Sequence, residues 1–273
     1  MLHAYLDESG IHDSSKAVAV IAAVATPQIW QAFDSKWTSF LTELGLSRWH
    51  HRDFDKVRND YRILSSDKLN WARERLCQII SDAAPFIVGA AIGRRLYEQV
   101  REQGKWRLPH DPYNFCLERC LNQAIKRVFS SRRDEGIVLF YDNKKRFGGI
   151  SRELTRWHRD TFEASYLSEF KQRAIDLQFL EVPDVPARSV PDIIAFEACA
   201  YIEADTGIPF LGAKLVEGET PEPRPIIKRL MDLQRAILAV ITYTASHLDL
   251  DLDHAGVVIR NNPPTLLAPK FWR

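Results

Sequence analysis

The sequence contains no apolar segment long enough to cross a membrane and no secretion signal. Its longest apolar run, Ala17–Ala25, is far shorter than the about 20 residues that a membrane-spanning helix needs. Near the N-terminus, Asp7 and Glu8 stand where a signal peptide would be apolar. We therefore expect a cytoplasmic protein with no membrane segment.

Cysteine is also scarce. The four cysteines are Cys77, Cys116, Cys120 and Cys199, and no two of them have the CxxC spacing of a zinc site or a redox motif. All four lie in segments that we predict to be helical, which favours buried free thiols. A chain of 273 residues buries enough apolar surface to fold without a disulfide or a zinc ion.

The chain has almost no net charge. Its 37 basic and 36 acidic side chains leave +1, which argues against a uniformly basic protein that coats nucleic acid. The charges are unevenly distributed, however, because residues 94–173 carry a net charge of +7 and residues 174–223 carry −8. This split is compatible with a polyanion that binds at the basic stretch.

Apolar patterning predicts strands that alternate with helices, and hence an α/β fold in which helices cover a sheet. The predicted strands are Leu2–Ser9, Ala17–Ala25, Phe86–Ile92, Gly136–Tyr141 and Ala174–Glu181, of which the first two form a β-hairpin. The predicted helices are Pro27–Leu46, Ser66–Ala83, Asp111–Phe129, Ser151–Ser168, Val190–Glu203 and Ile226–His247, and residues 47–64 are polar and irregular. We expect one domain over residues 1–223, with a C-terminal helical extension over residues 224–273 packed on it.

Three aspartates stand at the ends of predicted elements. Asp7 lies near the end of the first strand, Asp142 follows the apolar strand G-I-V-L-F-Y, and Asp192 opens an apolar helix. Each alone is explained as a turn residue or as an acid that complements a helix dipole. In an open α/β sheet, however, sites form beyond the strand ends, and adjacent strands are only about 4.8 Å apart. Because clustered carboxylates repel one another, a divalent cation is their expected partner.

Four segments in the same order resemble the bacterial and phage family called domain of unknown function 3800. They are Tyr5–Gly10 (Y-L-D-E-S-G), Trp49–Phe54 (W-H-H-R-D-F), Val138–Asp142 (V-L-F-Y-D) and Val190–Glu197 (V-P-D-I-I-A-F-E). The likeness spans roughly residues 1–205 and keeps all three aspartates. It departs from the family pattern at Val190 and Pro191, where Gln and Ala are usual, and at Asn143, where an acid is frequent.

The resemblance implies an RNase H-like fold, with a mixed central sheet that opens with a β-hairpin and is covered by helices. It also implies metal-dependent hydrolysis of phosphodiester bonds. Two Mg²⁺ or Mn²⁺ ions would then bind Asp7, Asp142 and Asp192, with Asp7 bridging both ions. Glu118, on the helix before the second aspartate strand, is the positional candidate for a fourth carboxylate, although a solvated helix acid would look the same.

Weaker candidates for the catalytic site lie beside these residues. Glu8 follows Asp7 directly, but in a regular strand it points to the opposite face and joins the site only if the strand breaks. His50 and His51 could position a substrate or relay a proton, or could be ordinary loop residues. Glu197 lies five residues after Asp192 and is expected to serve packing or a salt bridge rather than the same metal.

The expected partner is a nucleic acid, either DNA or RNA. Lys144, Lys145 and Arg146 follow Asp142 and are candidates for contacts with the phosphate backbone, although a solvated basic turn is the alternative.

The first hypothesis is therefore a nuclease. The alternative is a non-catalytic RNase H-like module that binds nucleic acid or protein in a defence or mobile-element system. A PIN-type nuclease is a rival at the level of the fold, and the apolar segment Ile226–His247 could pack in a homodimer as readily as in the core.

Overall fold

The computed structural model describes residues 1–12, 14–83, 85–102, 111–131, 136–142, 175–180, 185–203, 226 and 237–243. Its helices are α1 (Pro27–Leu44), α2 (His51–Asp55), α3 (Ser66–Ala83), α4 (Arg94–Glu102), α5 (Pro112–Ser131) and α7 (Ser189–Glu203), with the 3-10 helices η1 (Asn59–Ile63) and η4 (Pro186–Arg188). Its strands are β1 (Leu2–Ser9), β2 (Ala17–Ala25), β3 (Phe86–Gly93), β4 (Ile137–Asp142), β5 (Ile175–Leu180) and β6 (Ile237–Tyr243). Within these residues, no helix combines the length and the hydropathy that spanning a membrane requires.

The described strands form one mixed sheet in the order β5-β4-β1-β2-β3-β6. β1 pairs antiparallel with β2, and β2 with β3, whereas β4 lies parallel to β1, β5 to β4, and β6 to β3. The predicted hairpin is therefore present, with the predicted bounds, and occupies the centre of the sheet. β2 is buried along its whole length, because helices cover both of its faces.

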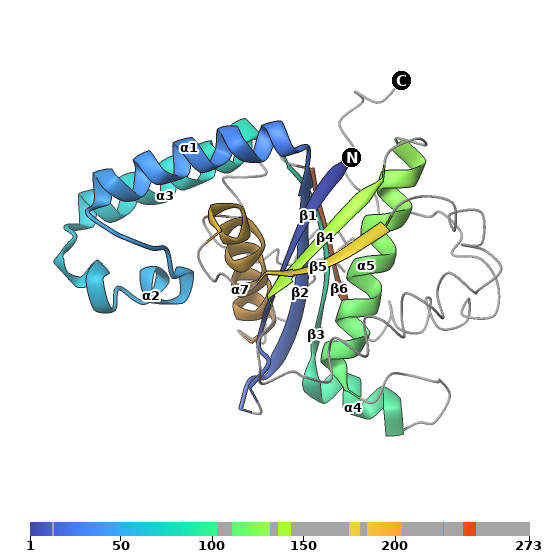
Figure 1. Cartoon of the computed structure of the whole chain (residues 1–273). Coiled ribbons are helices and arrows are strands. Elements are labelled where there is room, and N and C mark those ends of the chain that lie inside the picture. The colour runs from blue at the N-terminus through green and yellow to red at the C-terminus, as the bar shows by residue number, and fades with distance from the viewer. Residues whose placement is uncertain are drawn as a thin grey trace, which may run out of the picture.

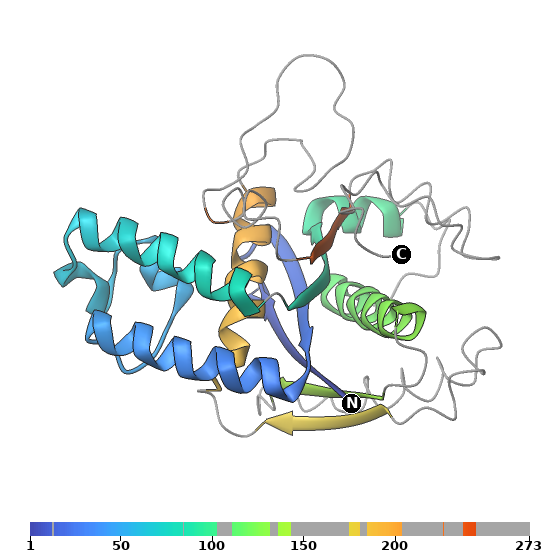
Figure 2. The same cartoon turned by 90° about the horizontal axis from the view of Figure 1, so that it is seen from above.

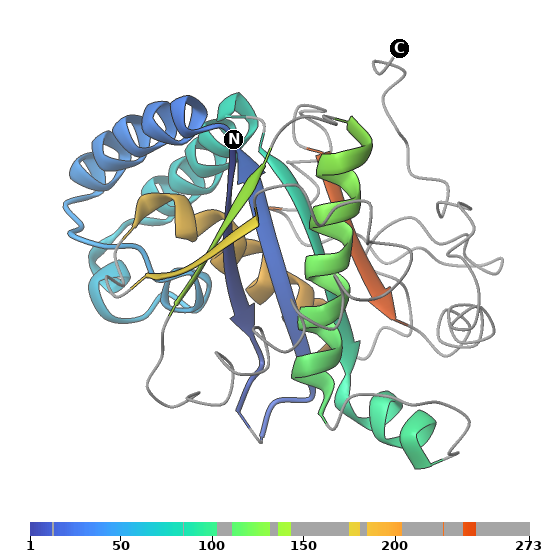
Figure 3. The same cartoon turned by 45° about the vertical axis from the view of Figure 1, so that its right-hand side comes forward.

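Helices cover both faces of the sheet (Figure 1). α7 packs against β1 and β2 on one face, and α5 packs against β2 and β3 on the other. Figure 2 shows α5 on one side of the central strands and α7, α1 and α3 on the other, and Figure 3 shows α5 running along the sheet. Each face has its own hydrophobic core. This arrangement confirms the predicted α/β class and fits an RNase H-like fold.

The long helix α1 shows how local sequence sets the ends of an element. The hydroxyl of Thr26 accepts a hydrogen bond from the backbone N–H of Ile29, and Pro27 occupies the first turn. The helix ends at Gly45, whose φ of 69° is left-handed and suits glycine. Between these ends, four aromatic residues spaced three or four apart are buried, namely Trp30, Phe33, Trp37 and Phe40. α1 packs against α3, and Figure 1 shows this pair extending away from the sheet.

The predicted helix over 226–247 is wrong in its central part. Residues 237–243 form β6, which pairs parallel with β3 from Phe86↔Ile237 to Ile92↔Tyr243. A short apolar run does not distinguish a buried helix from a buried strand by its periodicity. The sequence I-L-A-V-I-T-Y is rich in β-branched residues, which suit a strand, and β6 pairs with the otherwise open edge of β3. The boundary predicted at residues 223 and 224 lies outside the described residues, as does the helix predicted over 151–168.

Residues 47–64 are more regular than predicted, since they contain α2 and η1. Val57, in the turn after α2, and Asn59, the first residue of η1, have left-handed φ values of 47° and 50°. Asparagine adopts left-handed backbone more readily than most residues other than glycine, whereas it is costly for a β-branched residue such as valine. Neither short helix presents an apolar stripe that repeats over several turns, so periodicity carries no signal for them.

The prediction of buried free thiols is confirmed. Cys77 lies on α3, Cys116 and Cys120 on α5, and Cys199 on α7, and all four are free and buried. Burial raises the pKa of the Cys199 thiol to about 12, so this group stays protonated and unreactive at neutral pH.

Candidate functional site

The site is built where β1 and β4 run side by side. Leu6 pairs with Tyr141 across these parallel strands, so the next residue on each strand is an aspartate, Asp7 or Asp142. Adjacent strands lie about 4.8 Å apart. The structure therefore gives Asp7 and Asp142 neighbouring register positions, as expected from the strand-end pattern; for Asp142 it describes the backbone alone.

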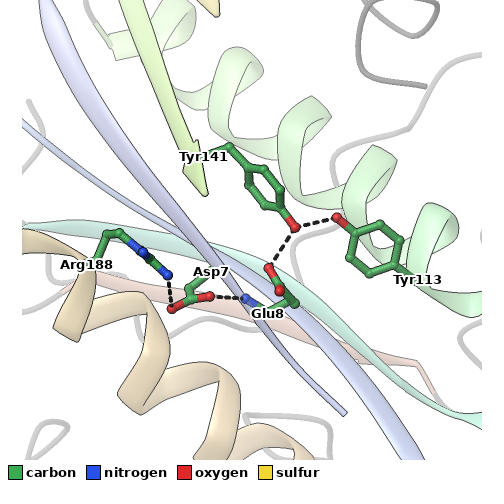
Figure 4. A network of polar contacts seen from close by, with 5 residues as sticks. All are labelled: Asp7, Glu8, Tyr113, Tyr141 and Arg188. Carbon is green, nitrogen blue, oxygen red and sulfur yellow. Dashed lines mark hydrogen bonds and ion pairs between the residues drawn. The ribbon is translucent and has the colours of Figure 1, made fainter. Parts of the chain in front are cut away.

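Asp7 is buried and makes polar contacts on the face covered by α7 (Figure 4). Its Oδ2 lies 3.3 Å from Nη2 of Arg188, and its Oδ1 accepts a hydrogen bond of 2.9 Å from the backbone N–H of Glu8. Arg188 is the last residue of η4 and is itself buried. A positive charge from the segment that precedes α7 thus already balances the carboxylate of Asp7.

Glu8 lies on the opposite face of the sheet from Asp7 (Figure 4). Because β1 stays regular through Ser9, alternation directs Glu8 toward α5, and the structure does not bring Glu8 into the site of Asp7. The hydroxyl of Tyr141 donates a hydrogen bond of 2.6 Å to Oε2 of Glu8, and the hydroxyl of Tyr113 on α5 lies 2.5 Å from that of Tyr141. Since the one hydroxyl proton of Tyr141 is used toward Glu8, Tyr113 donates to Tyr141.

Burial and the nearby charge of Glu8 keep both phenols protonated. Burial raises the pKa of Tyr141 far above its ordinary value, and the negative charge of Glu8 raises it further. Burial and the charge of Glu8 raise the pKa of Tyr113 in the same way. The network ties the first turn of α5 to the ends of β1 and β4, so it stabilises the strand ends from the side opposite Asp7.

Asp192 lies in the first turn of α7, four residues after Arg188, and is partly exposed. Burial raises the pKa of Tyr61 to about 12, and nearby carboxylates, including that of Asp192, add to this rise. The hydroxyl of Tyr61 accepts a hydrogen bond from the backbone N–H of His50. Asp192 therefore lies near the junction of α7 with residues 50–61, on the helix that directly follows Arg188.

The two neighbouring histidines have different surroundings. His51 is buried, and its Nε2 lies 2.8 Å from Oε1 of the buried Glu197 on α7. This buried contact agrees with the prediction that Glu197 serves packing or a salt bridge rather than the metal site. His50, the histidine predicted for catalysis, is largely exposed, and its Nδ1 lies 3.2 Å from Oδ2 of Asp53. Neither histidine contacts Asp7 through an ion pair or hydrogen bond that the structure describes.

Glu118 is exposed on α5, the helix that covers the face opposite Asp7. The structure does not place it beside Asp7, because the face of α5 that meets the sheet carries apolar residues, among them Cys116, Cys120 and Leu121. Lys144, Lys145 and Arg146, which we predict to contact a phosphate backbone, lie outside the described residues.

The donor chemistry of the three aspartates fits a divalent cation, since Mg²⁺ and Mn²⁺ prefer carboxylate oxygens. Among the side chains that the structure describes, no three His, Cys, Asp or Glu residues are grouped so that they could hold a metal ion. The Asp142 carboxylate is not among those side chains, so the site formed by three aspartates stays a prediction. A cation bound to Asp7 would also lie close to the positively charged side chain of Arg188.

No family model and no curated protein matches the chain. Similar solved structures include Bst-RNase HIII in complex with Mn²⁺, with 15% identity and a TM-score of 0.35, covering 76% of this chain and 56% of that chain. A mutant protein of Bst-RNase HIII has 15% identity and a TM-score of 0.36, covering 76% of this chain and 55% of that chain. The chain thus spans little more than half the length of the chains in these structures. The fold class rests on the mixed sheet with its central hairpin and its helices on both faces.

Sequence reasoning missed Arg188 and the two tyrosines. Arg188 stands in a proline-rich loop, where no periodicity singles it out, and its only signal is its position just before an apolar helix. Tyr141 had a clearer signal, because it carries a polar hydroxyl at the end of an otherwise apolar strand and directly precedes Asp142. A buried hydroxyl needs a partner, and that requirement points to Glu8.

Proposed function

We propose that this chain is a metal-dependent nuclease that hydrolyses phosphodiester bonds in DNA or RNA. The observation that carries the proposal is the neighbouring placement of Asp7 and Asp142 at the ends of two adjacent parallel strands, with α7 packed across β1. In α/β proteins, binding and catalytic sites form beyond the carboxyl ends of the parallel strands.

In this proposal Asp7, Asp142 and Asp192 hold two Mg²⁺ or Mn²⁺ ions. Such ions polarise a phosphate oxygen and lower the pKa of a bound water. Asp7 is supported by its burial, because a carboxylate removed from water attracts a cation more strongly than an exposed one. Lys144, Lys145 and Arg146, in the basic stretch after Asp142, would contact the phosphate backbone of the substrate.

The test is a cleavage assay on single- and double-stranded DNA and RNA, with Mg²⁺, Mn²⁺ or EDTA. Asp7→Asn and Asp142→Asn are compared with Glu43→Gln, which removes an exposed acid from α1. We expect metal-dependent cleavage by the native chain and the Glu43 variant, and a loss of at least about 100-fold in each aspartate variant. Circular dichroism establishes that the variants are folded. Cleavage that survives both aspartate substitutions would overturn the assignment.

A second candidate function is that of a non-catalytic module that binds nucleic acid or a protein partner. The ion pair between Asp7 and Arg188 favours it, because that pair balances the charge of Asp7 without a metal. A folded native chain that cleaves none of the four substrates with either metal, yet binds one of them, would support this candidate over the nuclease.

A further inference from the structure

We propose that Arg188 is a built-in counter-ion that competes with a divalent cation for Asp7 and so sets the metal affinity of the site. This inference rests on the proposed metal site and concerns its regulation. It assigns to Arg188 the role of a positioning residue, one that holds Asp7 in place while no metal is bound.

The geometry of the pair supports this role. Asp7 is 6% exposed and Arg188 is 8% exposed, so water and salt screen their attraction only weakly. Nη2 of Arg188 lies 3.3 Å from Oδ2 of Asp7, and the backbone N–H of Glu8 binds Oδ1 on the other side. Both carboxylate oxygens of Asp7, the atoms that would bind a metal ion, therefore have donors in the present structure.

A cation and the guanidinium are expected to exclude each other from Asp7. A divalent ion bound to this carboxylate would lie within a few ångströms of the charge of Arg188, and like charges repel strongly where the dielectric is low. The carboxylate of Glu8 lies on the other face of the sheet, toward α5, where it accepts a hydrogen bond from Tyr141. By linkage, whatever the ion pair adds to the stability of the metal-free fold is subtracted from the affinity for the cation.

The experiment uses Mn²⁺ alone as the probe, with the full chain and no nucleic acid. Free Mn²⁺ is measured by electron paramagnetic resonance, and melting temperatures are recorded in EDTA and in Mn²⁺. Arg188→Met removes the charge but keeps most of the bulk, whereas Arg188→Lys is the control that keeps the charge. Asp7→Asn, alone and combined with Arg188→Met, identifies the binding that depends on Asp7.

We expect Arg188→Met to bind Mn²⁺ about 5- to 150-fold more tightly than the native chain, the usual range for coupled sites. Arg188→Lys should bind within about 3-fold of the native chain, and variants with Asp7→Asn should lose the binding. In EDTA, Arg188→Met should melt at a lower temperature, and Mn²⁺ should raise its melting temperature more than that of the native chain. An Arg188→Met variant that binds Mn²⁺ no more tightly than the native chain overturns the proposal, and so does the absence of binding at Asp7.

A measurement on the native chain keeps the proposal falsifiable if Arg188→Met does not fold. In protein labelled with ¹⁵N-arginine, the Nε–H resonance of Arg188 should shift when Mg²⁺ is added, whereas that of the exposed Arg48 should not. A resonance of Arg188 that is unchanged at saturating Mg²⁺ contradicts the proposal. The two proposals can fail separately. If Arg188→Met binds Mn²⁺ more tightly but the native chain cleaves no substrate, only the proposed nuclease activity is refuted. If cleavage requires Asp7 but Arg188→Met leaves the Mn²⁺ affinity unchanged, only the proposed competition is refuted.

Discussion

Nε2 of His51 lies 2.8 Å from Oε1 of Glu197, although the two residues are 146 positions apart in the sequence. Both side chains are buried, and the imidazole contacts the aromatic ring of Phe196 edge-on. The pair joins α2 to α7, the helix whose first turn carries Asp192. The two residues come from the segments 49–54 and 190–197, which the fold brings into contact.

Breaking this pair should destabilise the protein strongly. Glu197→Ala leaves the buried Nε2 of His51 without this hydrogen-bond partner, and we expect the free energy of unfolding to fall by about 1–3 kcal/mol. Urea denaturation measures the loss. The matched control is His50→Gln, because His50 is adjacent in sequence but has a side chain that is 58% exposed. This control should change the stability by less than about 0.5 kcal/mol. Equal losses in the two variants would contradict a special contribution from the buried pair.

The hydrogen bond from Tyr141 to Glu8 should make a measurable contribution of its own. Tyr141→Phe removes only the hydroxyl, and we expect a loss of about 1.5–3 kcal/mol, the usual worth of a hydrogen bond to a charged group. A double-mutant cycle with Glu8→Gln, followed by urea denaturation, isolates the pairwise term. A coupling energy within about 0.5 kcal/mol of zero would show that the two side chains contribute independently.

Asp34 should make the stability depend on pH. Burial raises the pKa of this α1 carboxyl to about 6, and a hydrogen bond from the backbone N–H of Ala187 lowers it only in part. The folded state therefore holds the proton more tightly than the unfolded state, whose carboxyl has a pKa of 3.8. The free energy of unfolding should fall as the pH rises from about 4 to about 6, and the penalty should be fully present above that range.

The variant that checks this dependence is Asp34→Asn, which keeps an oxygen to accept the bond from Ala187 but carries no charge. At pH 7.5 it should be more stable than the native chain by about 1 kcal/mol, a value discounted because Asp34 is only half-buried. Below pH 4 the difference should disappear. Thermal denaturation at pH 7.5 and at pH 3.5 measures both states, and a difference that is the same at the two pH values would refute the prediction.

Gly10, which follows β1, should tolerate no side chain. Its φ is +75°, and a Cβ built there would overlap the carbonyl oxygen of Ala17 and lie 3.1 Å from Sγ of Cys199. Gly45 has a similar φ of +69° but no atom within 4 Å of a built Cβ. We expect Gly45→Ala to cost about 1–2 kcal/mol from backbone strain alone. Gly10→Ala should cost clearly more, because the hairpin must also move. Chemical denaturation of both variants separates the two effects, and equal costs would mean that the hairpin accommodates the methyl group.

Prediction from sequence succeeded where the signal is local. The bounds of β1, β2 and α3 match the predicted ranges, because alternation along a strand and a capped amphipathic repeat are properties of neighbouring residues. The opposite orientation of Asp7 and Glu8 was also predictable, since it follows from the period of a regular strand. β6 was not predictable in this way, because its seven residues gain their strand geometry from pairing with β3.

The sequence by itself thus determined the α/β class, the opening hairpin and the position of an aspartate at the ends of β1 and β4. Only the tertiary structure decided which side chains meet these aspartates. The pairs Asp7–Arg188 and His51–Glu197 join residues 181 and 146 positions apart, and each depends on how α7 packs across the sheet. The physical reason is that a buried polar or charged group must find its partner in space, and neighbours in space follow from packing and strand register rather than from proximity along the chain.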